Sequence, residues 1–266
     1  MTDRPTTRPP GPRWPLLAAL AVLAALLAGC GASTIPAVHS EPERLSLGRR
    51  ALANQEYNVA IELLRSYVAN NAGGADVDLA IEMLGEAHLR IKEWAEAQSQ
   101  FERLLRDYPE SDSAASGSFH LAEALWGQSR GPDYDQEFTR RALEQYQTYL
   151  GAYPGHRLNG AAEMSVQRAF ERLSAKMADA GELYVKLQRP VPARAYFHRV
   201  LEEYPTTAAV PRAELGLALA DALAGERDAA MGTLRELAVR YAGQPVGRRA
   251  GKELARLERQ ARKQKK

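Results

Sequence analysis

The side chains that could perform acid–base or metal chemistry are scattered along this sequence of 266 residues. A helical metal or proton-transfer site needs ligands three or four residues apart, because those positions share one helix face. None of the five histidines is paired with another histidine at that spacing, and the many carboxylates recur at positions typical of solvated helix faces. We therefore expect no metal centre. The histidines are His39, His88, His120, His156 and His198.

No motif for nucleophilic or phosphate chemistry stands in its required context. The pattern G-x-S-x-G occurs at residues 127–131, but it follows a helical pattern and no expected strand, so it does not predict a nucleophile elbow. Residues 247–252 resemble a phosphate-binding loop, but the stretch is one residue short, lacks the following Ser or Thr and follows no expected strand. We therefore expect the chain not to be an enzyme and to bind no cofactor.

The single cysteine has a different chemistry. Cys30 follows Leu27, Ala28 and Gly29 at the end of an apolar run of about 14 residues, which is shorter than the roughly 20 that span a bilayer. A basic segment precedes the run, and this order is typical of a signal peptide. The ending Leu-Ala-Gly-Cys resembles a bacterial lipobox. We expect residues 1–29 to be removed and Cys30 to carry a diacylglycerol and an acyl chain. A short membrane anchor with an incidental cysteine is the alternative.

The residues after Cys30 indicate where the lipid would hold the protein. Gly31, rather than Asp, follows the cysteine, and by the lipoprotein sorting rule this implies export to the outer membrane. Residues 30–42 are small, polar and proline-containing, which is typical of a tether. Two or more acyl chains give stable anchoring. We therefore expect a lipid-anchored protein that faces the periplasm.

The charge is balanced overall but unevenly distributed. Removing residues 1–29 takes away three Arg and one Asp, which leaves 35 − 3 = 32 basic and 33 − 1 = 32 acidic residues. From residue 247 onward nine Lys or Arg face two Glu, so this end carries about +7 and the preceding body about −7. A basic end can bind nucleic acid or anionic lipid, or can be a solvated helix end. We expect no nucleic acid partner for an exported protein.

Residues 84–109 have the pattern of a helical hairpin. Gly85 and Ala97 are small, as two helices require where their backbones touch, and Phe101 and Leu104 fill the seam at i+4 and i+7 from Ala97. Pro109 ends the unit because proline cannot continue a helix. One hairpin of about 34 residues cannot bury its own apolar face, so it needs stacked neighbours. The pattern resembles the tetratricopeptide repeat.

The same landmarks recur in four more places. Gly48 and Ala60 each precede their counterparts Gly85 and Ala97 by 37 residues (85 − 48 and 97 − 60). The second helices of the first, third, fourth and fifth repeats carry Ala60, Leu64 and Tyr67; Ala142, Tyr146 and Tyr149; Ala193, Phe197 and Val200; and Ala230, Leu234 and Leu237. The sequence therefore predicts an all-α fold. We expect a right-handed solenoid of about five such hairpins over residues 43–245, followed by a basic capping helix and tail over 246–266.

Two irregularities interrupt the array. In the third repeat, residues 127–138 form a connection that is roughly eight residues longer than the standard turn. Such an insertion is either a partner-binding loop or a tolerated surface loop. Residues 158–187 contain no strong helix breaker and predict one helix of about thirty residues. Its first half, with Val166, Ala169 and Leu173, is extra to the repeat and must pack against its predecessor.

This irregular layout behind a lipobox resembles the BamD (YfiO) family of outer-membrane assembly lipoproteins. The resemblance covers residues 30 to about 245 and is sharpest over residues 134–205, although no aromatic–proline ending follows the first repeat and the basic tail is longer. It implies a lipoprotein scaffold of the β-barrel assembly machinery. The C-terminal repeats would hold the POTRA domains of an Omp85-type barrel protein, and the N-terminal repeats would receive unfolded outer-membrane proteins.

A solenoid presents a concave groove lined by its first helices, on the side that faces away from each hairpin seam. By helical spacing the candidate peptide groove comprises Arg49, Leu52, Glu82, Glu86, Arg90, Phe119, Glu123 and Trp126. Each residue could instead be solvated or pack between repeats. Phe119 and Trp126 are aromatic anchors seven residues apart on one face, or else core residues.

Two other classes of protein remain open. The first is another cell-envelope scaffold, either Tol-associated or one that recruits peptidoglycan enzymes; Tol-associated proteins usually carry an N-terminal coiled coil, and no heptad run precedes residue 45. The second is a lytic enzyme on a helical solenoid, for which the roughly 20 residues after the fifth repeat are too few.

Overall fold

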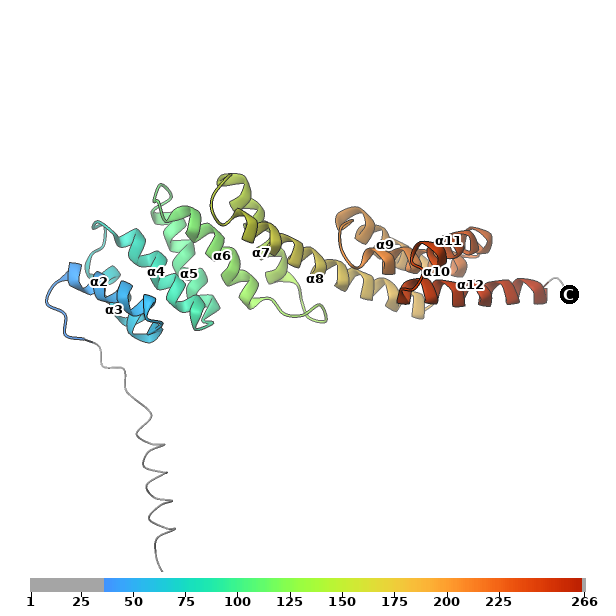
Figure 1. Ribbon diagram of the computed structural model, residues 1–266, viewed down its shortest axis with the longest axis horizontal. Helices are drawn as coiled ribbons and strands as arrows, with labels where there is room; N and C mark the ends of the chain where they lie inside the picture. Colours follow the sequence, from blue (N-terminus) through green and yellow to red (C-terminus); the bar gives the residue numbers. More distant parts are fainter. Residues whose placement is uncertain (1–35, 265–266) are drawn as a thin grey trace, which may run out of the picture.

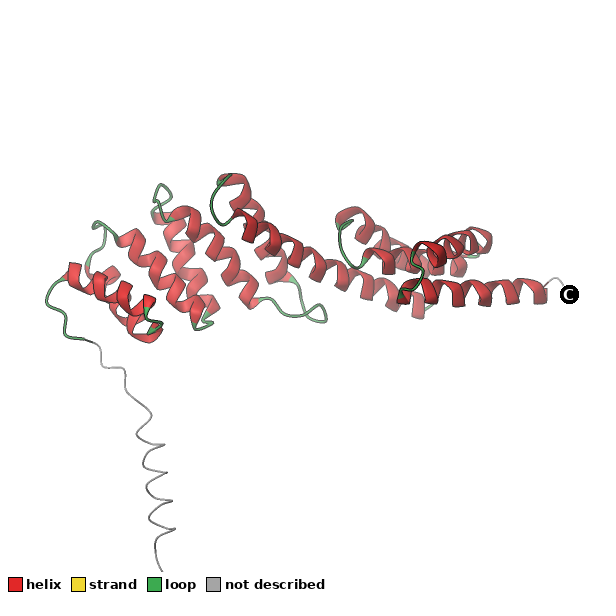
Figure 2. Cartoon of the chain, in the orientation of Figure 1, coloured by secondary structure: helices red, strands yellow, loops and turns green. Residues whose placement is uncertain are grey.

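The computed structural model describes residues 36–264, which form eleven helices and no strand (Figure 2). The expected signal peptide over residues 1–29 with its Leu27, Ala28 and Gly29 motif, the lipidation site Cys30 and the first part of the tether lie outside the described residues. Within residues 36–264, none of the helices combines the length and the apolar character required to cross a bilayer.

Five antiparallel hairpins stack along the molecule and a single helix closes the array, as the repeat pattern predicts (Figure 1). The hairpins are α2 (Glu41–Ala53) with α3 (Tyr57–Asn70), α4 (Val77–Arg90) with α5 (Trp94–Asp107), α6 (Ala114–Gln128) with α7 (Glu137–Ala152), α8 (Asn159–Lys186) with α9 (Pro190–Glu203), and α10 (Val210–Ala224) with α11 (Arg227–Arg240); the closing helix is α12 (Pro245–Gln264). The chain is an elongated helical solenoid with α2 at one end and α12 at the other.

Small residues set the distance between the two helices of a hairpin. A Cβ atom on Gly85 would lie 2.7 Å from the Phe101 ring, and one on Gly181 would lie 2.6 Å from Phe197. Phe101, Phe197 and Ala97 are completely buried. The seam is therefore an aromatic ring packed against glycine, as the spacing predicts, and a side chain in place of the glycine would push the helices apart.

The first helix begins earlier than expected, because residues 41 and 42 belong to α2 and not to the tether. The Ser40 hydroxyl accepts a hydrogen bond from the Glu43 backbone N–H at 3.3 Å, and Pro42 lies in the first turn, where a missing N–H costs nothing. The capping helix likewise begins at Pro245 instead of residue 246. Proline in these segments starts helices and does not mark a linker.

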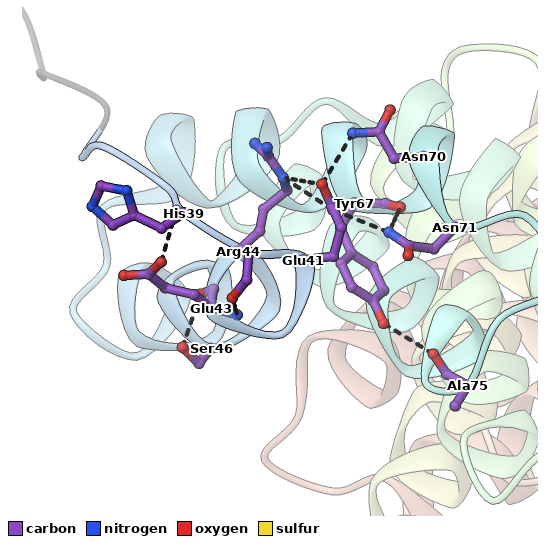
Figure 3. A network of polar contacts seen from close by, with 10 residues as sticks. His39, Glu41, Glu43, Arg44, Ser46, Tyr67, Asn70, Asn71 and Ala75 are labelled. Carbon is purple, nitrogen blue, oxygen red and sulfur yellow. Dashed lines mark hydrogen bonds and ion pairs between the residues drawn. The ribbon is translucent and has the colours of Figure 1, made fainter.

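A polar network ties this first helix to the end of α3 (Figure 3). The Glu41 carboxylate accepts hydrogen bonds from Arg44 at 3.1 Å, Asn71 at 3.0 Å and Asn70 at 3.3 Å. Burial opposes the ionisation of Glu41, but these donors outweigh it and lower its pKa. The Tyr67 hydroxyl donates to the Ala75 carbonyl at 2.9 Å, which fixes the turn into α4. These hydrogen bonds join both helices of the first hairpin to one another and to the turn before α4.

The long helix α8 joins the two halves of the molecule. Ala162 at its start belongs to the core around Phe119 and Tyr146, whereas Ala178 belongs to a separate core around Phe197. Ala169 and Leu173 between them are buried. The expected helix of about thirty residues is confirmed as 28 residues, and its first half packs against the third repeat as predicted.

The insertion in the third repeat is held by hydrogen bonds within itself and to α8. Gln136 is buried and donates from Nε2 to the carbonyls of Gly131 at 2.8 Å and Tyr134 at 3.0 Å. From α8, Arg172 donates to the Ser129 hydroxyl at 2.6 Å and Lys176 to the Tyr134 carbonyl at 3.0 Å. The insertion therefore braces the middle of the long helix against the third repeat.

Candidate functional site

Two adjoining hollows form a groove over the first helices of the second, third and fourth repeats. They have volumes of about 280 and 370 Å³. Both contain Phe119 and Glu123 of α6, which therefore form the shared wall. We call this surface the N-terminal groove; its lining residues are Glu86, Leu89, Arg90, Trp94, Phe119, His120, Glu123, Ala161, Met164, Ser165 and Arg168.

The second repeat supplies one side of the groove. On α4, Arg90 Nη2 donates to Glu86 Oε1 at 2.7 Å, and this hydrogen bond is the main reason why the pKa of Arg90 is raised. Trp94 stands at the start of α5 and packs against Gly127, where a Cβ atom would overlap the indole ring. The rim on this side therefore combines the Arg90–Glu86 ion pair, which has no net charge, with the aromatic ring of Trp94.

The floor of the groove is aromatic. Phe119 is only 7% exposed, and its ring lies 5.7 Å from Tyr149 and 5.9 Å from Tyr146, centroid to centroid. His120 lies 5.5 Å from the Phe119 ring, and burial lowers its pKa despite the acidic side chains around it. The Nδ1 atom of His120 is buried and has no hydrogen-bond partner within residues 36–264. Burial in the groove wall therefore favours the neutral form of the imidazole.

Glu123 is the most highly connected charge in the groove. Its carboxylate accepts hydrogen bonds from the Tyr146 hydroxyl and from Ser165 Oγ at 3.4 Å, and Arg168 Nη2 lies 3.5 Å away. Burial, followed by the charge of Glu123, raises the pKa of Tyr146, so the phenol stays protonated and donates. Because these contacts join α6, α7 and α8, Glu123 fixes the spacing of the groove walls.

The eight residues expected to line the groove separate into two groups. Glu86, Arg90, Phe119 and Glu123 do line it. Glu82 instead accepts hydrogen bonds from Ser113 Oγ at 2.7 Å and from Ser116 Oγ, which ties α4 to the start of α6. Trp126 is covered by two guanidinium groups, Arg172 at 3.9 Å and Arg168 at 5.2 Å from its ring centroid.

The two first-repeat positions also lie outside the groove. Leu52 is half-buried and packs against the N-terminal core, and Arg49 is exposed on α2. Helical spacing alone predicts a groove position for Arg49, Leu52, Glu82 and Trp126, because spacing within one helix contains no information about how the next repeat packs on it. The contacts between neighbouring repeats differ, so the same face is covered at some positions and open at others.

Five lining residues with larger side chains were not anticipated: Leu89, Trp94, His120, Met164 and Arg168. Met164 is 66% exposed on the first half of α8. One signal in the sequence could have identified it, because a methionine among the small residues of the extra half-helix has no place in the repeat pattern. Trp94 and His120 had no such signal, since their position depends on how α4, α5 and α6 pack.

The groove offers binding surface and no recognisable catalytic arrangement. Its charged groups are engaged in side-chain pairs, and its floor is apolar. Within residues 36–264, no group of three or more His, Cys, Asp or Glu is placed to hold a metal ion. A hollow with an aromatic floor and paired charges on its rim suits an extended or helical protein segment.

Most of the chain is similar to known outer-membrane proteins. Residues 39–233 match the family model YfiO, described as an outer membrane lipoprotein. The chain is 26% identical over 200 residues to the outer membrane protein assembly factor BamD of Caulobacter vibrioides, and the alignment covers 73% of this chain and 66% of that protein. The chain thus spans just under two thirds of the length of this relative.

Solved structures with similar helices include a TPR protein of Thermus thermophilus, with a TM-score of 0.34 and 18% identity over 82% of this chain and 98% of the other. The TPR2AB domain of yeast Sti1 gives a TM-score of 0.38 and 13% identity over 82% and 96% of the two chains. The family match extends over most of the chain, and the chain belongs to the YfiO family of outer membrane lipoproteins.

Proposed function

We propose that this protein is a non-enzymatic scaffold of the β-barrel assembly machinery, held by lipid on Cys30 at the periplasmic side of the outer membrane. The assembly role rests on membership of the YfiO family and on the likeness to the Caulobacter assembly factor. The single observation that carries the binding role is the N-terminal groove, whose shared wall is Phe119 and Glu123. In this proposal the groove receives segments of unfolded outer-membrane proteins.

The composition of the groove suits clients of many sequences. Met164 is flexible and polarisable, so it can adapt to different apolar side chains, and Phe119 and Trp94 supply rigid aromatic surface. Arg90 and Glu86, like Arg168 and Glu123, neutralise one another, and the groove therefore imposes no strong charge preference. Such a surface favours apolar side chains over any particular charged motif.

The C-terminal half offers a second, more basic hollow for the Omp85-type barrel protein. It has a volume of about 480 Å³ and lies over the end of α8, α10 and α12. Lys186, Arg227, Arg249 and Arg256 line it together with a single carboxylate, Glu253. We propose that a POTRA domain with acidic side chains docks here, because charge complementarity steers and orients association.

A pull-down from native membranes tests this function. The C-terminally tagged lipoprotein is extracted in detergent, and co-eluting proteins are identified by mass spectrometry beside a Cys30→Ala control. We expect a stoichiometric Omp85-type protein in the wild-type eluate and its persistence in the control, because lipid would only localise the complex. Recovery of Tol proteins or peptidoglycan enzymes without that barrel protein would overturn the assembly role.

A further inference from the structure

The last helix carries a row of cations along the face opposite its buried side. We define the basic row as Arg248, Lys252, Arg259, Arg262 and Lys263, all exposed. We propose that the basic row docks on anionic phospholipid headgroups, so that the protein contacts the membrane at its C-terminal end independently of its lipid anchor.

The row follows from the amphipathic pattern of α12. Gly247, Ala250 and Leu257 are buried against the fifth repeat, and these positions share one helix face. At 100° per residue, Lys252, Arg259 and Lys263 lie on the opposite face, together with the exposed Ala255 between them. The helix therefore cannot turn its apolar side to a membrane, and the face opposite its buried side presents mainly cations.

The basic row lacks the carboxylate partners that neutralise the other cations of α12. Arg256 lies 2.7 Å from Glu253, Arg249 lies 3.8 Å from Glu182, and Glu258 pairs with Arg235 of α11. Within residues 36–264, none of the five row residues forms an ion pair, and their one side-chain hydrogen bond is from Arg248 to the Gly243 carbonyl at 2.6 Å. The last two residues of the sequence, both Lys, add to the same charge.

The shape of this face favours a lipid surface over a protein. The hollow beside α12 is lined by Arg249, Glu253, Arg256, Leu257 and Gln260, and the basic row lies outside it. A stable protein interface needs a buried apolar centre, which a straight helix with an outward row of Lys and Arg lacks. A bilayer with anionic headgroups presents many equivalent phosphates and requires no such centre.

A weak contact suffices because, in the proposed function on which this step rests, lipid on Cys30 already holds the chain near the bilayer. Each basic side chain near an anionic membrane strengthens binding about fivefold, and a flexible tether gives an effective concentration on the order of millimolar. In Figure 1, α12 lies at the opposite end of the solenoid from α2, the helix that follows the tether in the sequence. Contact at both ends would lay the solenoid along the membrane.

The test holds the protein on vesicles by a means that does not depend on Cys30. Residues 30–266, which include all the described helices, carry an N-terminal polyhistidine tag and Cys30→Ala and are bound to vesicles through a nickel-chelating lipid. Ala255→Cys then provides one thiol inside the basic row for a donor dye, and an acceptor dye is placed in the bilayer. Vesicles contain phosphatidylcholine with or without phosphatidylglycerol.

We expect energy transfer from position 255 with phosphatidylglycerol and its loss with phosphatidylcholine alone or in high salt. Lys252→Glu, Arg259→Glu and Lys263→Glu together should weaken the contact about a hundredfold or more, because each substitution removes a cation and adds an anion. The matched control carries Arg50→Glu, Arg65→Glu and Arg157→Glu, which reverse the charge of three exposed arginines outside α12. This control should keep the energy transfer. Equal transfer from both vesicle types, or equal loss in the control, overturns the inference. Neither result bears on the assembly role, since no partner protein is present.

Discussion

The guanidinium of Arg172 lies 3.9 Å from the centroid of the Trp126 ring and donates to the Ser129 hydroxyl at 2.6 Å. Trp126 and Ser129 stand at the end of α6, and Arg172 stands at the middle of α8. Burial, together with nearby Arg168, lowers the pKa of Arg172 from its usual value, although it remains a cation at neutral pH. This pair joins the end of α6 in the third repeat to the middle of the long helix.

The first prediction concerns that pair. Arg172→Ala and Trp126→Ala should each destabilise the protein, and the double variant should lose less than the sum of both. A partly buried cation–π contact predicts a coupling free energy of about 1–2 kcal/mol. Chemical denaturation of the four proteins of this double-mutant cycle measures it. Strict additivity would mean that the stacking contributes nothing.

The second prediction concerns the hairpin seam. A Cβ atom on Gly85 would lie 2.7 Å from the Phe101 ring, so Gly85→Ala should lower the free energy of unfolding by about 1–3 kcal/mol. Gly232 in the middle of α11 is the matched control, because a Cβ atom there would meet nothing within 4 Å. Gly232→Ala should raise the stability by about 0.5–1 kcal/mol, since alanine favours a helix over glycine. The two variants should therefore move the thermal midpoint in opposite directions.

The third prediction concerns pH. Burial lowers the pKa of His120 below its ordinary value of 6.5, so the unfolded chain binds a proton more readily than the folded one. The contribution of His120 to stability is therefore present above pH 6.5 and is lost as pH falls through the folded pKa. His120 faces Glu86, Glu82, Glu123 and Arg90, and the first three oppose the effect of burial. His120→Gln should weaken the fall in stability below pH 6.5, as urea denaturation over a pH series would measure.

The same series contains its own check. The other four histidines are unchanged in the variant, so only the difference between the two pH curves belongs to His120. Curves that remain parallel from pH 5 to 8 would contradict the effect of burial.

The fourth prediction concerns client binding. Met164 is 66% exposed in the N-terminal groove, and Met164→Asp should weaken binding of unfolded outer-membrane protein segments about tenfold or more, since a charge replaces an apolar contact. Val239→Asp is the control, because Val239 is 74% exposed on α11, far along the chain from the groove. Fluorescence anisotropy with a labelled client peptide compares the two. Equal weakening by both variants would locate the client elsewhere.

The sequence by itself determined the hairpins, because the residues that specify each hairpin lie close together in the sequence. Gly85, Ala97 and Phe101 lie within one repeat, and their spacing alone predicts a close helix pair with a filled seam. The uninterrupted helical pattern likewise predicted α8, since no residue within it breaks a helix. The expected lipidation of Cys30 also rests on sequence alone and stays a prediction.

Only the tertiary structure decided which helix faces are open. Glu82 and Trp126 have the periodicity of groove residues, yet Ser113 and Ser116 engage one and Arg172 covers the other. Met164 became a groove residue because the first half of α8 packs beside α6 as a further wall. Periodicity fixes the direction in which a side chain leaves its own helix, whereas exposure depends on the angle and side chains of the next repeat, which lie far away in the sequence.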